Sequence, residues 1–312
     1  MNSSPQSGIQ VHRVSFLHGW RWLRHGFSLL GMAPRHLLLL MLLMVVISNL
    51  LAIFGLLGAV LAKLLVPVML VGYLATLCKL APPGTRLPVA PAAHRPVRAT
   101  SLRLEDAWRW TQDRKTLFTV VQLGLVSLVI DLTAYFLSGY GAASEATLQA
   151  MSALSSNQTP DPAQLAQAMA PMLDAILMMM AITLPCHVLM WFAPVFAGLH
   201  RLPLLKSLVF SAVAVSRNLP AFFCYGFSVL LFTLGLALLV QLLNGLLGGI
   251  AGMAGALLAS PLLMLLMPVI LAVLVCSQWA CYLDTVAVEA PTRQAPALPE
   301  AEPPADDGSP SA

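Results

Sequence analysis

The apolar positions of this chain form long runs, and short segments that hold most of the charged residues separate them. A helix needs about 20 predominantly apolar residues to cross a hydrocarbon core about 30 Å thick. The pattern predicts six such helices, over residues 37–55, 59–78, 117–137, 171–199, 219–243 and 261–283. The expected fold is therefore all-α, a polytopic transmembrane helical bundle of six spans.

The rest of the chain divides around this bundle. Residues 1–13 are predicted to be a disordered N-terminal tail and residues 14–284 the six-span domain. Residues 285–312 are rich in Pro, Ala and acidic side chains and bury too little apolar surface to fold, so we expect a disordered tail. The Gly- and Ala-rich stretch 244–260 between the last two spans is expected to be a semi-buried loop or a short re-entrant turn, and the sequence leaves this choice open.

The basic residues alternate along the chain and predict its orientation. Lys and Arg occur before the first span, between spans two and three, and between spans four and five, whereas the other three links contain none. Basic links stay on the cytoplasmic side of a membrane. The sequence therefore predicts a multi-pass protein of a bacterial inner membrane with both termini in the cytoplasm.

Each basic segment has the periodicity of an amphipathic helix. Apolar side chains recur at steps of four and three in residues 16–30, and similar patterns occur in residues 104–115 and 203–218. We expect helices that lie in the membrane interface, where cations meet anionic lipid headgroups, so membrane lipids are the predicted partners. The predicted aromatic anchors of the first two segments are Trp20, Trp22, Trp108 and Trp110.

The order of these features repeats three times. An amphipathic segment is followed by a span without an interior proline, an uncharged or acidic link, and a span with an interior proline, namely Pro67, Pro185 or Pro268. We interpret the six spans as three hairpin repeats, each preceded by a cytoplasmic interfacial helix. Internal repeats are frequent in transporters, although a duplication without any transport role leaves the same pattern.

Part of the chain resembles a known family. The stretch from Met190 to Gly226 contains Ala193-Pro194, Lys206-Ser207-Leu208 and Arg217-Asn218, and it is similar to an uncharacterised BPSS-type family of proteobacterial multi-pass inner-membrane proteins. The segment Gly19 to Trp22 is similar as well, so the resemblance extends over residues 14–284. It implies the fold and the location, and it brings no activity, cofactor or site residue.

Composition excludes several classes of protein. Of the 312 residues, 58% are hydrophobic and 10% charged, whereas a soluble domain has roughly 25% charged residues. The net charge of +4 comes from basic residues placed between apolar runs, which is not the pattern of a nucleic-acid-binding surface. The five cysteines form no CxxC pair, so we expect neither disulfides nor a metal site.

Three charged residues inside predicted spans are the first candidates for a functional site, because such groups are costly in a bilayer. They are Lys63, Asp131 and Asp174. Counting residues along each helix places all three near the same outer edge of the membrane. We therefore predict that Lys63 pairs with Asp131, Asp174 or both; a structural ion pair, or side chains that reach the outer headgroups, would explain the same residues.

Ser48, Asn49 and His187 lie nearer the middle of their predicted spans. Beside Pro185, an imidazole in a kinked helix would be placed to line a cavity or to relay protons. Hydrogen bonding between helices is the plainer interpretation of these three residues.

Function remains open among three hypotheses, of which an intramembrane enzyme is the least favoured. A permease-like transporter of a small or lipid-like molecule accounts for the repeats and the intramembrane polar groups. A non-catalytic membrane scaffold or lipid-organising protein accounts for the interfacial helices and the scarcity of charge at the midplane. We predict no enzyme activity and no cofactor, because HExxH, GxSxG and P-loop motifs are absent.

Overall fold

The computed structural model describes residues 9–82, 104–155 and 162–288. Within these residues, six helices are long and apolar enough to cross a membrane. These segments are Pro34–Ala52, Gly55–Leu80, Arg114–Ser138, Ala166–Gly198, Leu219–Leu242 and Leu266–Thr285. The chain is therefore built as a multi-pass membrane protein.

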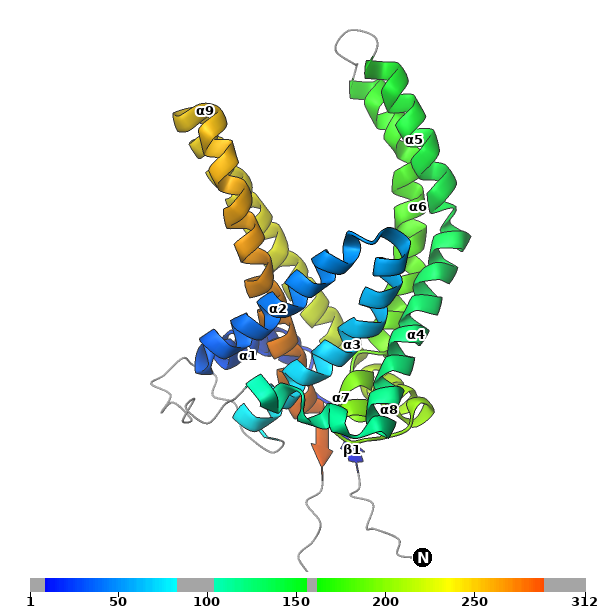
Figure 1. Ribbon diagram of the computed structural model, residues 1–312, viewed down its shortest axis with the longest axis vertical. Helices are drawn as coiled ribbons and strands as arrows, with labels where there is room; N and C mark the ends of the chain where they lie inside the picture. Colours follow the sequence, from blue (N-terminus) through cyan, green and yellow to red (C-terminus); the bar gives the residue numbers. More distant parts are fainter. Residues whose placement is uncertain (1–8, 83–103, 156–161, 289–312) are drawn as a thin grey trace, which may run out of the picture.

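The structure contains two short strands and nine α-helices over the described residues, with two 3₁₀ helices between α3 and α4 (Figure 1). In chain order the elements are β1 (Ile9–Val11), α1 (His18–Met32), α2 (Pro34–Ala52), α3 (Gly55–Leu80), η2 (Leu104–Ala107), η3 (Arg109–Gln112), α4 (Arg114–Ser138), α5 (Tyr140–Ser155), α6 (Pro162–Leu189), α7 (Ala193–Gly198), α8 (Leu204–Arg217), α9 (Leu219–Thr285) and β2 (Val286–Val288).

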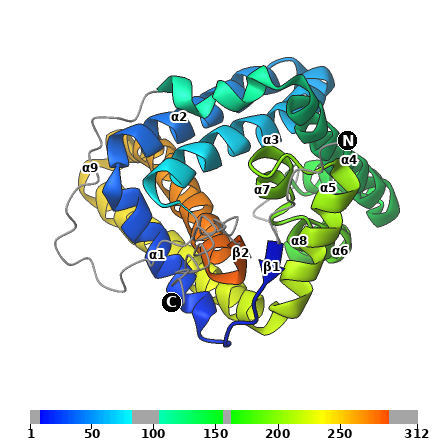
Figure 2. The same ribbon diagram turned by 90° about the horizontal axis from the view of Figure 1, so that it is seen from below.

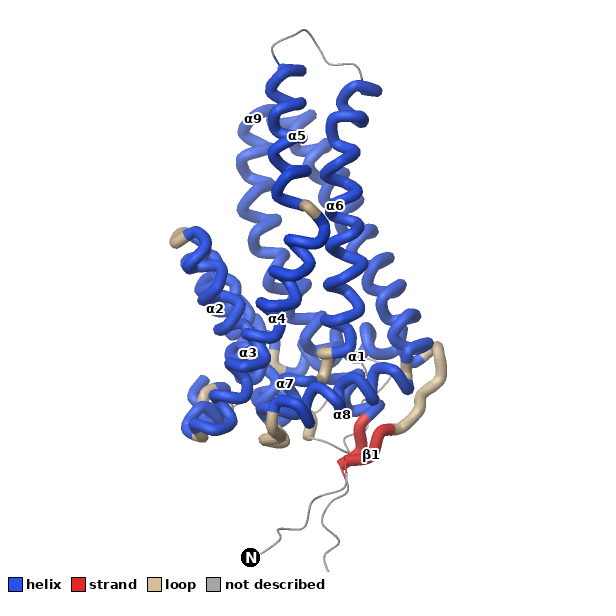
Figure 3. Tube along the Cα trace, turned by 90° about the vertical axis from the view of Figure 1, so that its right-hand side faces the viewer, coloured by secondary structure: helices blue, strands red, loops and turns tan. Residues whose placement is uncertain are grey.

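The helices are held together at one end of the bundle and separate towards the other. We call the end with β1, β2, α7 and α8 the strand end, and the end with α5 and the middle of α9 the far end (Figure 1). Figure 2 views the strand end and shows the two strands inside the ring of helices. In Figure 3, α4 and α5 rise beside α6 as one long antiparallel pair that reaches the far end.

The last two membrane-capable segments lie in one element, α9, which folds back on itself. The Tyr225 and Ser277 hydroxyls are hydrogen-bonded although 52 residues separate them, and a straight helix of that length would hold them about 78 Å apart. The backbone of residues 244–260 is helical throughout. The expectation of an irregular loop there is therefore wrong, and the two legs of α9 join within a helical element.

The core lies at the strand end and is largely aromatic. Trp22, Trp279, Tyr282, Phe192 and Phe196 are fully buried there. The Trp22 ring packs against Phe222 and Tyr225 of α9, with centroids 5.4 and 6.0 Å away. By contrast, many large apolar side chains on the membrane-capable helices are exposed. Buried aromatic surface at one end thus holds together helices whose outer faces are left for lipid.

Helix α1 crosses both legs of α9 at very short range. A Cβ atom added to Gly19 would lie 2.3 Å from the Ala221 carbonyl oxygen, and one added to Gly26 would lie 2.7 Å from that of Val273. Only glycine, which has no side chain, permits this approach. The two glycines lie seven residues apart, two helical turns, so they place the same face of α1 against the two legs in succession.

A hydroxyl group stabilises the bend between α6 and α7. Ser211 of α8 donates to the Leu189 carbonyl at 2.8 Å and accepts from the Phe192 amide at 2.9 Å. Both backbone groups would otherwise lack a partner where the helix is interrupted. The Gln278 side chain of α9 donates to the Trp191 carbonyl within the same bend.

Two segments differ from the sequence-based expectation. Residues 104–115 contain the separate turns η2 and η3 and not one amphipathic helix. Lys79 forms an ion pair with Asp106 at 2.6 Å, and the Ala107 backbone packs on Gly72, so contacts with α3 determine the local geometry. Residues 9–11, assigned to a tail, pair in antiparallel register with residues 286–288 because the two ends of the domain meet there. The remaining residues of both predicted tails, 1–8 and 289–312, lie outside the described residues.

The close approach of α1 to α9 gives a first prediction. Replacing Gly26→Ala forces a methyl group against the Val273 carbonyl, and we expect a loss of roughly 1–3 kcal/mol in the free energy of unfolding. Gly31→Ala, in the same helix, meets no atom within 4 Å and should be neutral or stabilising by up to about 1 kcal/mol. Reversible unfolding in mixed detergent micelles measures both. Equal stability of the two variants would contradict the prediction.

Candidate functional site

Four polar side chains from three membrane-capable helices meet where these helices pack side by side. The Lys63 ammonium group of α3 lies against Asp131 Oδ2 of α4. The other carboxylate oxygen, Oδ1, lies 3.6 Å from His187 Nε2 of α6. The Ser127 hydroxyl of α4 is 3.1 Å from the same nitrogen. We call these four residues the polar cluster.

Local geometry explains why these residues meet. Ser127 and Asp131 are four residues apart and therefore share one face of α4. A Cβ atom added to Gly124 would lie 2.8 Å from the Lys63 carbonyl, so the backbone of α3 approaches α4 at the position of this lysine. On the other side, α4 packs along α6 and meets His187. The glycine sets the distance to α3, and the four-residue spacing directs both polar groups towards α6.

The hydrogen bonds of His187 define its tautomer. Nδ1 lies 2.8 Å from the Thr183 carbonyl oxygen, which can only accept, so Nδ1 carries the proton. In a neutral imidazole Nε2 is then an acceptor, and the Ser127 hydroxyl donates to it. In a protonated imidazole Nε2 would instead donate a hydrogen bond, and Ser127 and Asp131 Oδ1 are the acceptors within reach.

The cluster lies well inside the membrane-capable segments. Lys63 is eight residues beyond Gly55, and Asp131 is seven residues before Ser138, which correspond to about 12 and 10 Å along their helices. The exposed fractions of the Lys63, Asp131 and His187 side chains are 47%, 26% and 39%. A charged group at the centre of a bilayer costs about 3 kcal/mol or more. The cluster is thus a costly group of polar side chains that neighbouring helices do not enclose.

Asp174 does not join the cluster. It is an exposed residue of α6, 13 residues from His187 and hence about 20 Å further along the helix towards the far end. No ion pair links it to another described residue. Its displacement arises because α6 extends past the end of α4 and runs along α5. The predicted partners Lys63 and Asp131 do meet, and Asp174 stands apart from them.

Ser48 and Asn49 of α2 are also separate from His187. Their side chains donate to backbone carbonyls one turn back in their own helix, at Met44 and Val45, over 2.9 and 2.8 Å. These bonds lie within one helix, whereas the sequence suggested bonds between helices or a shared cavity.

The four anchor tryptophans have different surroundings. Trp20 is 49% exposed, whereas Trp22 is fully buried and its indole N–H donates to Asp284 Oδ2 at 2.8 Å. Trp108 and Trp110 are half-buried. Two positions of one motif therefore differ: Trp20 faces outward and Trp22 is part of the core.

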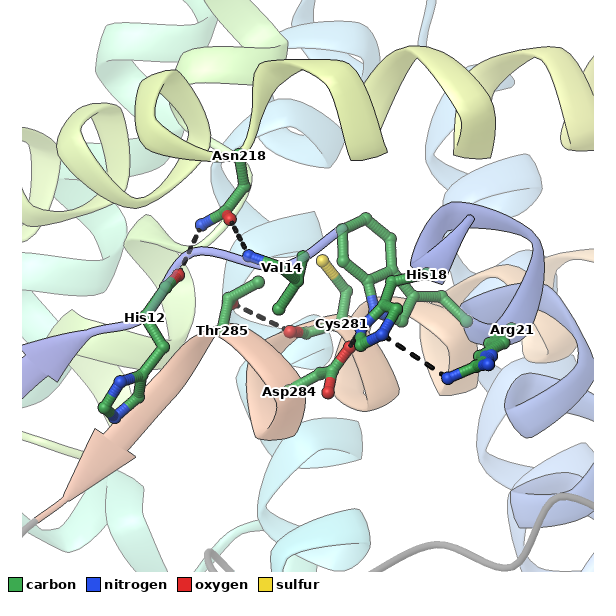
Figure 4. A network of polar contacts seen from close by, with 9 residues as sticks. His12, Val14, His18, Arg21, Asn218, Cys281, Asp284 and Thr285 are labelled. Atoms are coloured by element: carbon green, nitrogen blue, oxygen red, sulfur yellow. Dashed lines mark hydrogen bonds and ion pairs between the residues drawn. The ribbon is translucent and has the colours of Figure 1, made fainter. Parts of the chain in front are cut away.

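A second polar network lies at the strand end (Figure 4). Asp284 accepts from Trp22 and contacts His18 Nδ1 at 2.7 Å. Close by, the buried Asn218 side chain accepts from the Val14 amide and donates to the His12 carbonyl, both at 2.9 Å. The network joins the chain before α1 to the junction of α8 and α9 and to the end of α9. Its groups satisfy one another, which indicates a structural role.

Sequence reasoning missed two participants in these sites. Ser127 joins the polar cluster, and its four-residue spacing from Asp131 was a usable signal. Asp284 receives the Trp22 indole, and its place at the edge of the last apolar run gave no indication of that partner. The position of Ser127 beside Asp131 could be predicted from α4 alone, because the two residues share one face of that helix. The bond between Trp22 and Asp284 joins residues 262 positions apart.

Burial of His200, between α7 and α8, gives a pH-dependent prediction. Burial lowers the pKa of this imidazole, which contacts the Tyr282 hydroxyl. The unfolded chain binds the proton more readily, so the free energy of unfolding should fall as pH drops below about 6.5. Melting temperatures measured from about pH 7.5 to 5 should decline less in His200→Gln than in the wild type. An identical decline in both proteins would refute this assignment.

The polar cluster gives a third prediction. In a double-mutant cycle of Lys63→Met and Asp131→Asn, we expect a coupling energy of about 1 kcal/mol, since the pair is partly exposed. The matched cycle of Lys63→Met with Asp174→Asn should be additive within about 0.5 kcal/mol. Unfolding in detergent micelles measures both cycles. Strict additivity in the first would show that the Lys63–Asp131 contact contributes nothing to stability.

Comparison with known proteins supports the membrane location. Over 129 residues the chain is 37% identical to a protein of Burkholderia thailandensis named "probable inner membrane protein", and the match covers 40% of this chain and 43% of the relative. The chain thus matches less than half of that relative's length. No family model matches, and neither does any solved structure. The resemblance to the BPSS-type family therefore stays a prediction, while the relative and the six apolar helices together describe a multi-pass membrane protein.

Proposed function

We propose that this protein is a permease for an amphiphilic, lipid-like molecule. The observation that carries this proposal is the polar cluster, in which three membrane-capable helices bring an ammonium, a carboxylate and an imidazole together while leaving each partly exposed. An enclosed ion pair is stable only when further hydrogen bonds satisfy its remaining polar atoms. Partial exposure instead leaves room for the headgroup of a bound molecule to contact the same atoms.

The apolar surroundings of the cluster support the choice of substrate class. Each membrane-capable segment contains an 18-residue stretch of high mean hydropathy. In five of the six segments, between 11% and 28% of this stretch is buried inside the protein, against 56% in Leu266–Thr285. Apolar side chains thus line the bundle on its lipid-facing surfaces. An amphiphile can place its headgroup at the cluster while its hydrocarbon tail stays among lipids. A fully polar solute would lack this continuous apolar contact.

The proposed arrangement in the membrane has both termini in the cytoplasm. Its support is the separation of charge: Lys and Arg occur in α1, η3, α8 and the first turn of α4, whereas the chain between α2 and α3, α5 and residues 243–260 contain neither. On this view α1 and α8 lie near the cytoplasmic surface. Their exposed cations would contact anionic lipid headgroups.

Three hairpin repeats are part of the same proposal. The pairs α2–α3, α4–α6 and the two legs of α9 each contain an interior proline in the returning helix, at Pro67, Pro185 and Pro268. Repeated units with interrupted helices are a common architecture of transporters, in which one unit moves against another. The break between α6 and α7 adds such an interruption next to the helix that carries His187.

A non-catalytic scaffold that organises lipid or a partner protein is the alternative. The exposed apolar faces of the far end favour it, because the α4–α5 and α6 pair extends well beyond the neighbouring α2–α3 hairpin (Figure 3). Such a projection offers a surface for a partner. A scaffold would not need the polar cluster to be intact, and this difference separates the two hypotheses.

The test is purification in native lipid nanodiscs followed by mass spectrometry of the retained lipids and proteins. We expect one amphiphile enriched several-fold over bulk lipid with the wild type, and its loss in the Lys63→Met/Asp131→Asn double variant, which removes both charges at similar side-chain volume. Asp174→Asn is the matched control and should retain the amphiphile. A stoichiometric partner protein, together with a lipid profile equal in all three proteins, would support the scaffold instead.

A further inference from the structure

We propose that the turn between α2 and α3 ends within the hydrocarbon layer, where acyl chains of the lipid leaflet nearest the far end surround it. The α2–α3 hairpin then enters and leaves the membrane on the same side, and α4, α6 and the two legs of α9 are the segments that cross. This inference does not depend on the permease function. Both termini stay on one face of the membrane, because the hairpin returns to the side from which it starts.

The turn carries only apolar side chains. Residues 50–62, with the sequence LLAIFGLLGAVLA, contain no polar residue between Asn49 and Lys63. Ile53 and Leu56, on either side of the turn, are 78% and 79% exposed. A connection that emerges into water is usually built from polar and turn-forming residues. The composition of this turn instead favours contact with hydrocarbon.

Helix α5 also lies at the far end and has a different composition (Figure 1). Its polar side chains are Tyr140, Ser144, Glu145, Thr147, Gln149, Ser152 and Ser155. Glu145 and Gln149 are exposed. Charged and amide side chains belong on surfaces in contact with water. The two connections are thus suited to different surroundings, which indicates that they lie at different levels in the membrane.

The turn is too short to extend to a distant surface. Ile53 and Phe54 alone separate α2 from α3, and their amides donate to the Leu50 and Leu51 carbonyls at 3.3 and 3.0 Å. Gly55 adopts a positive φ of 59°, which glycine permits without strain. The chain therefore reverses directly where the two helices end, and the position of the turn is the limit of the hairpin.

Helix α4 provides a scale for the depth of this turn. Arg114 and Lys115 lie in its first turn, at the strand end. A hydrocarbon layer of about 30 Å, measured from Lys115, corresponds to about 20 helical residues and reaches Tyr135. The Tyr135 ring packs on that of Tyr140 with centroids 5.8 Å apart, and such rings are frequent at the headgroup level. The boundary at the far end is therefore near Tyr135.

The α2–α3 turn does not reach that boundary. A Cβ atom added to Gly124 would lie 2.8 Å from the Lys63 carbonyl oxygen, so these two residues are at the same level. Tyr135 is about 16 Å beyond Gly124 along α4, whereas Gly55 is only about 12 Å beyond Lys63 along α3. Helix α3 also slants relative to α4, which shortens its reach (Figure 1), and Figure 3 shows the turn below the junction of α4 and α5. The turn thus ends inside the hydrocarbon layer.

The contact between Lys63 and Asp131 agrees with this depth. Asp131 lies about 10 Å further towards the far end than Gly124, the residue level with the Lys63 backbone. Side chains of a helix lean towards its N-terminus, and α3 begins at its turn with α2 whereas α4 begins at the strand end. Lys63 therefore leans towards the far end from a deep backbone position, and Asp131 leans down to meet it.

The first test is labelling of introduced thiols with a charged maleimide in the full-length protein in lipid nanodiscs. The wild type is the blank for the five native cysteines. We expect Ile53→Cys and Leu56→Cys to react at least about tenfold more slowly than Leu148→Cys, an exposed position of α5, because the reactive thiolate forms only in contact with water. All three variants should react fully in SDS. Equal rates at the three positions in nanodiscs would contradict the proposal.

The second test identifies what surrounds the turn, from the collisions of spin labels at the same positions with oxygen and with a nickel chelate. Oxygen concentrates in hydrocarbon, whereas the chelate stays in water. We expect frequent oxygen and rare nickel collisions at Ile53→Cys and Leu56→Cys, as at the exposed position Leu125→Cys of α4, and the reverse at Leu148→Cys.

Two results of this measurement would overturn the proposal. Frequent nickel collisions at the turn would place it in water, so that α2 and α3 cross the whole membrane. Rare collisions with both reagents would place the turn against protein, such as a second copy of this chain, and not against lipid.

Discussion

The close approach of α1 to both legs of α9 organises this structure. Gly19 and Gly26 bring the backbone of α1 into contact with Ala221 and Val273, which lie in different legs of α9. Because glycine has no side chain to separate the helices, α1 holds the two legs at fixed positions near the strand end. The buried Trp22 ring then fills the space beside this crossing, and its indole N–H meets Asp284.

This packing explains why the bundle is compact at one end only. Aromatic rings and small residues gather at the strand end, where α1, α7 and α8 pack beside the membrane-capable helices and the two strands lie inside the ring of helices. Towards the far end the same helices have neighbours on fewer sides, and their exposed side chains are apolar. In a bilayer such faces are stable against lipid, because no hydrophobic force drives apolar helices together there.

The polar cluster belongs to this open part of the bundle. Lys63, Asp131 and His187 would each be unfavourable alone in lipid, and they offset part of that cost by meeting. The Nε2 atom of His187 lies 3.6 Å from Asp131 Oδ1, on the side of the carboxylate away from the Lys63 contact at Oδ2. The proposed permease function is placed at this cluster.

The sequence by itself determined the number of membrane-capable helices and their approximate positions. In lipid every backbone polar group must be satisfied internally, so a run of about 20 apolar residues has few structures other than a helix. The contact between Lys63 and Asp131 could also be predicted from the sequence, because opposite charges inside adjacent apolar helices stabilise each other when they pair.

Tertiary structure decided the remaining features. Asp174 stands apart because α6 continues past α4 along α5, which the span count did not reveal. Residues 244–260 stay helical while the chain reverses, and residues 104–115 break into 3₁₀ turns against α3. The buried bond of Trp22 to Asp284 joins residues far apart in the chain. Hydropathy determines which segments enter a membrane. It carries no information on the relative position of two helices along their axes, because that position depends on close contacts such as those of Gly26 and Gly124.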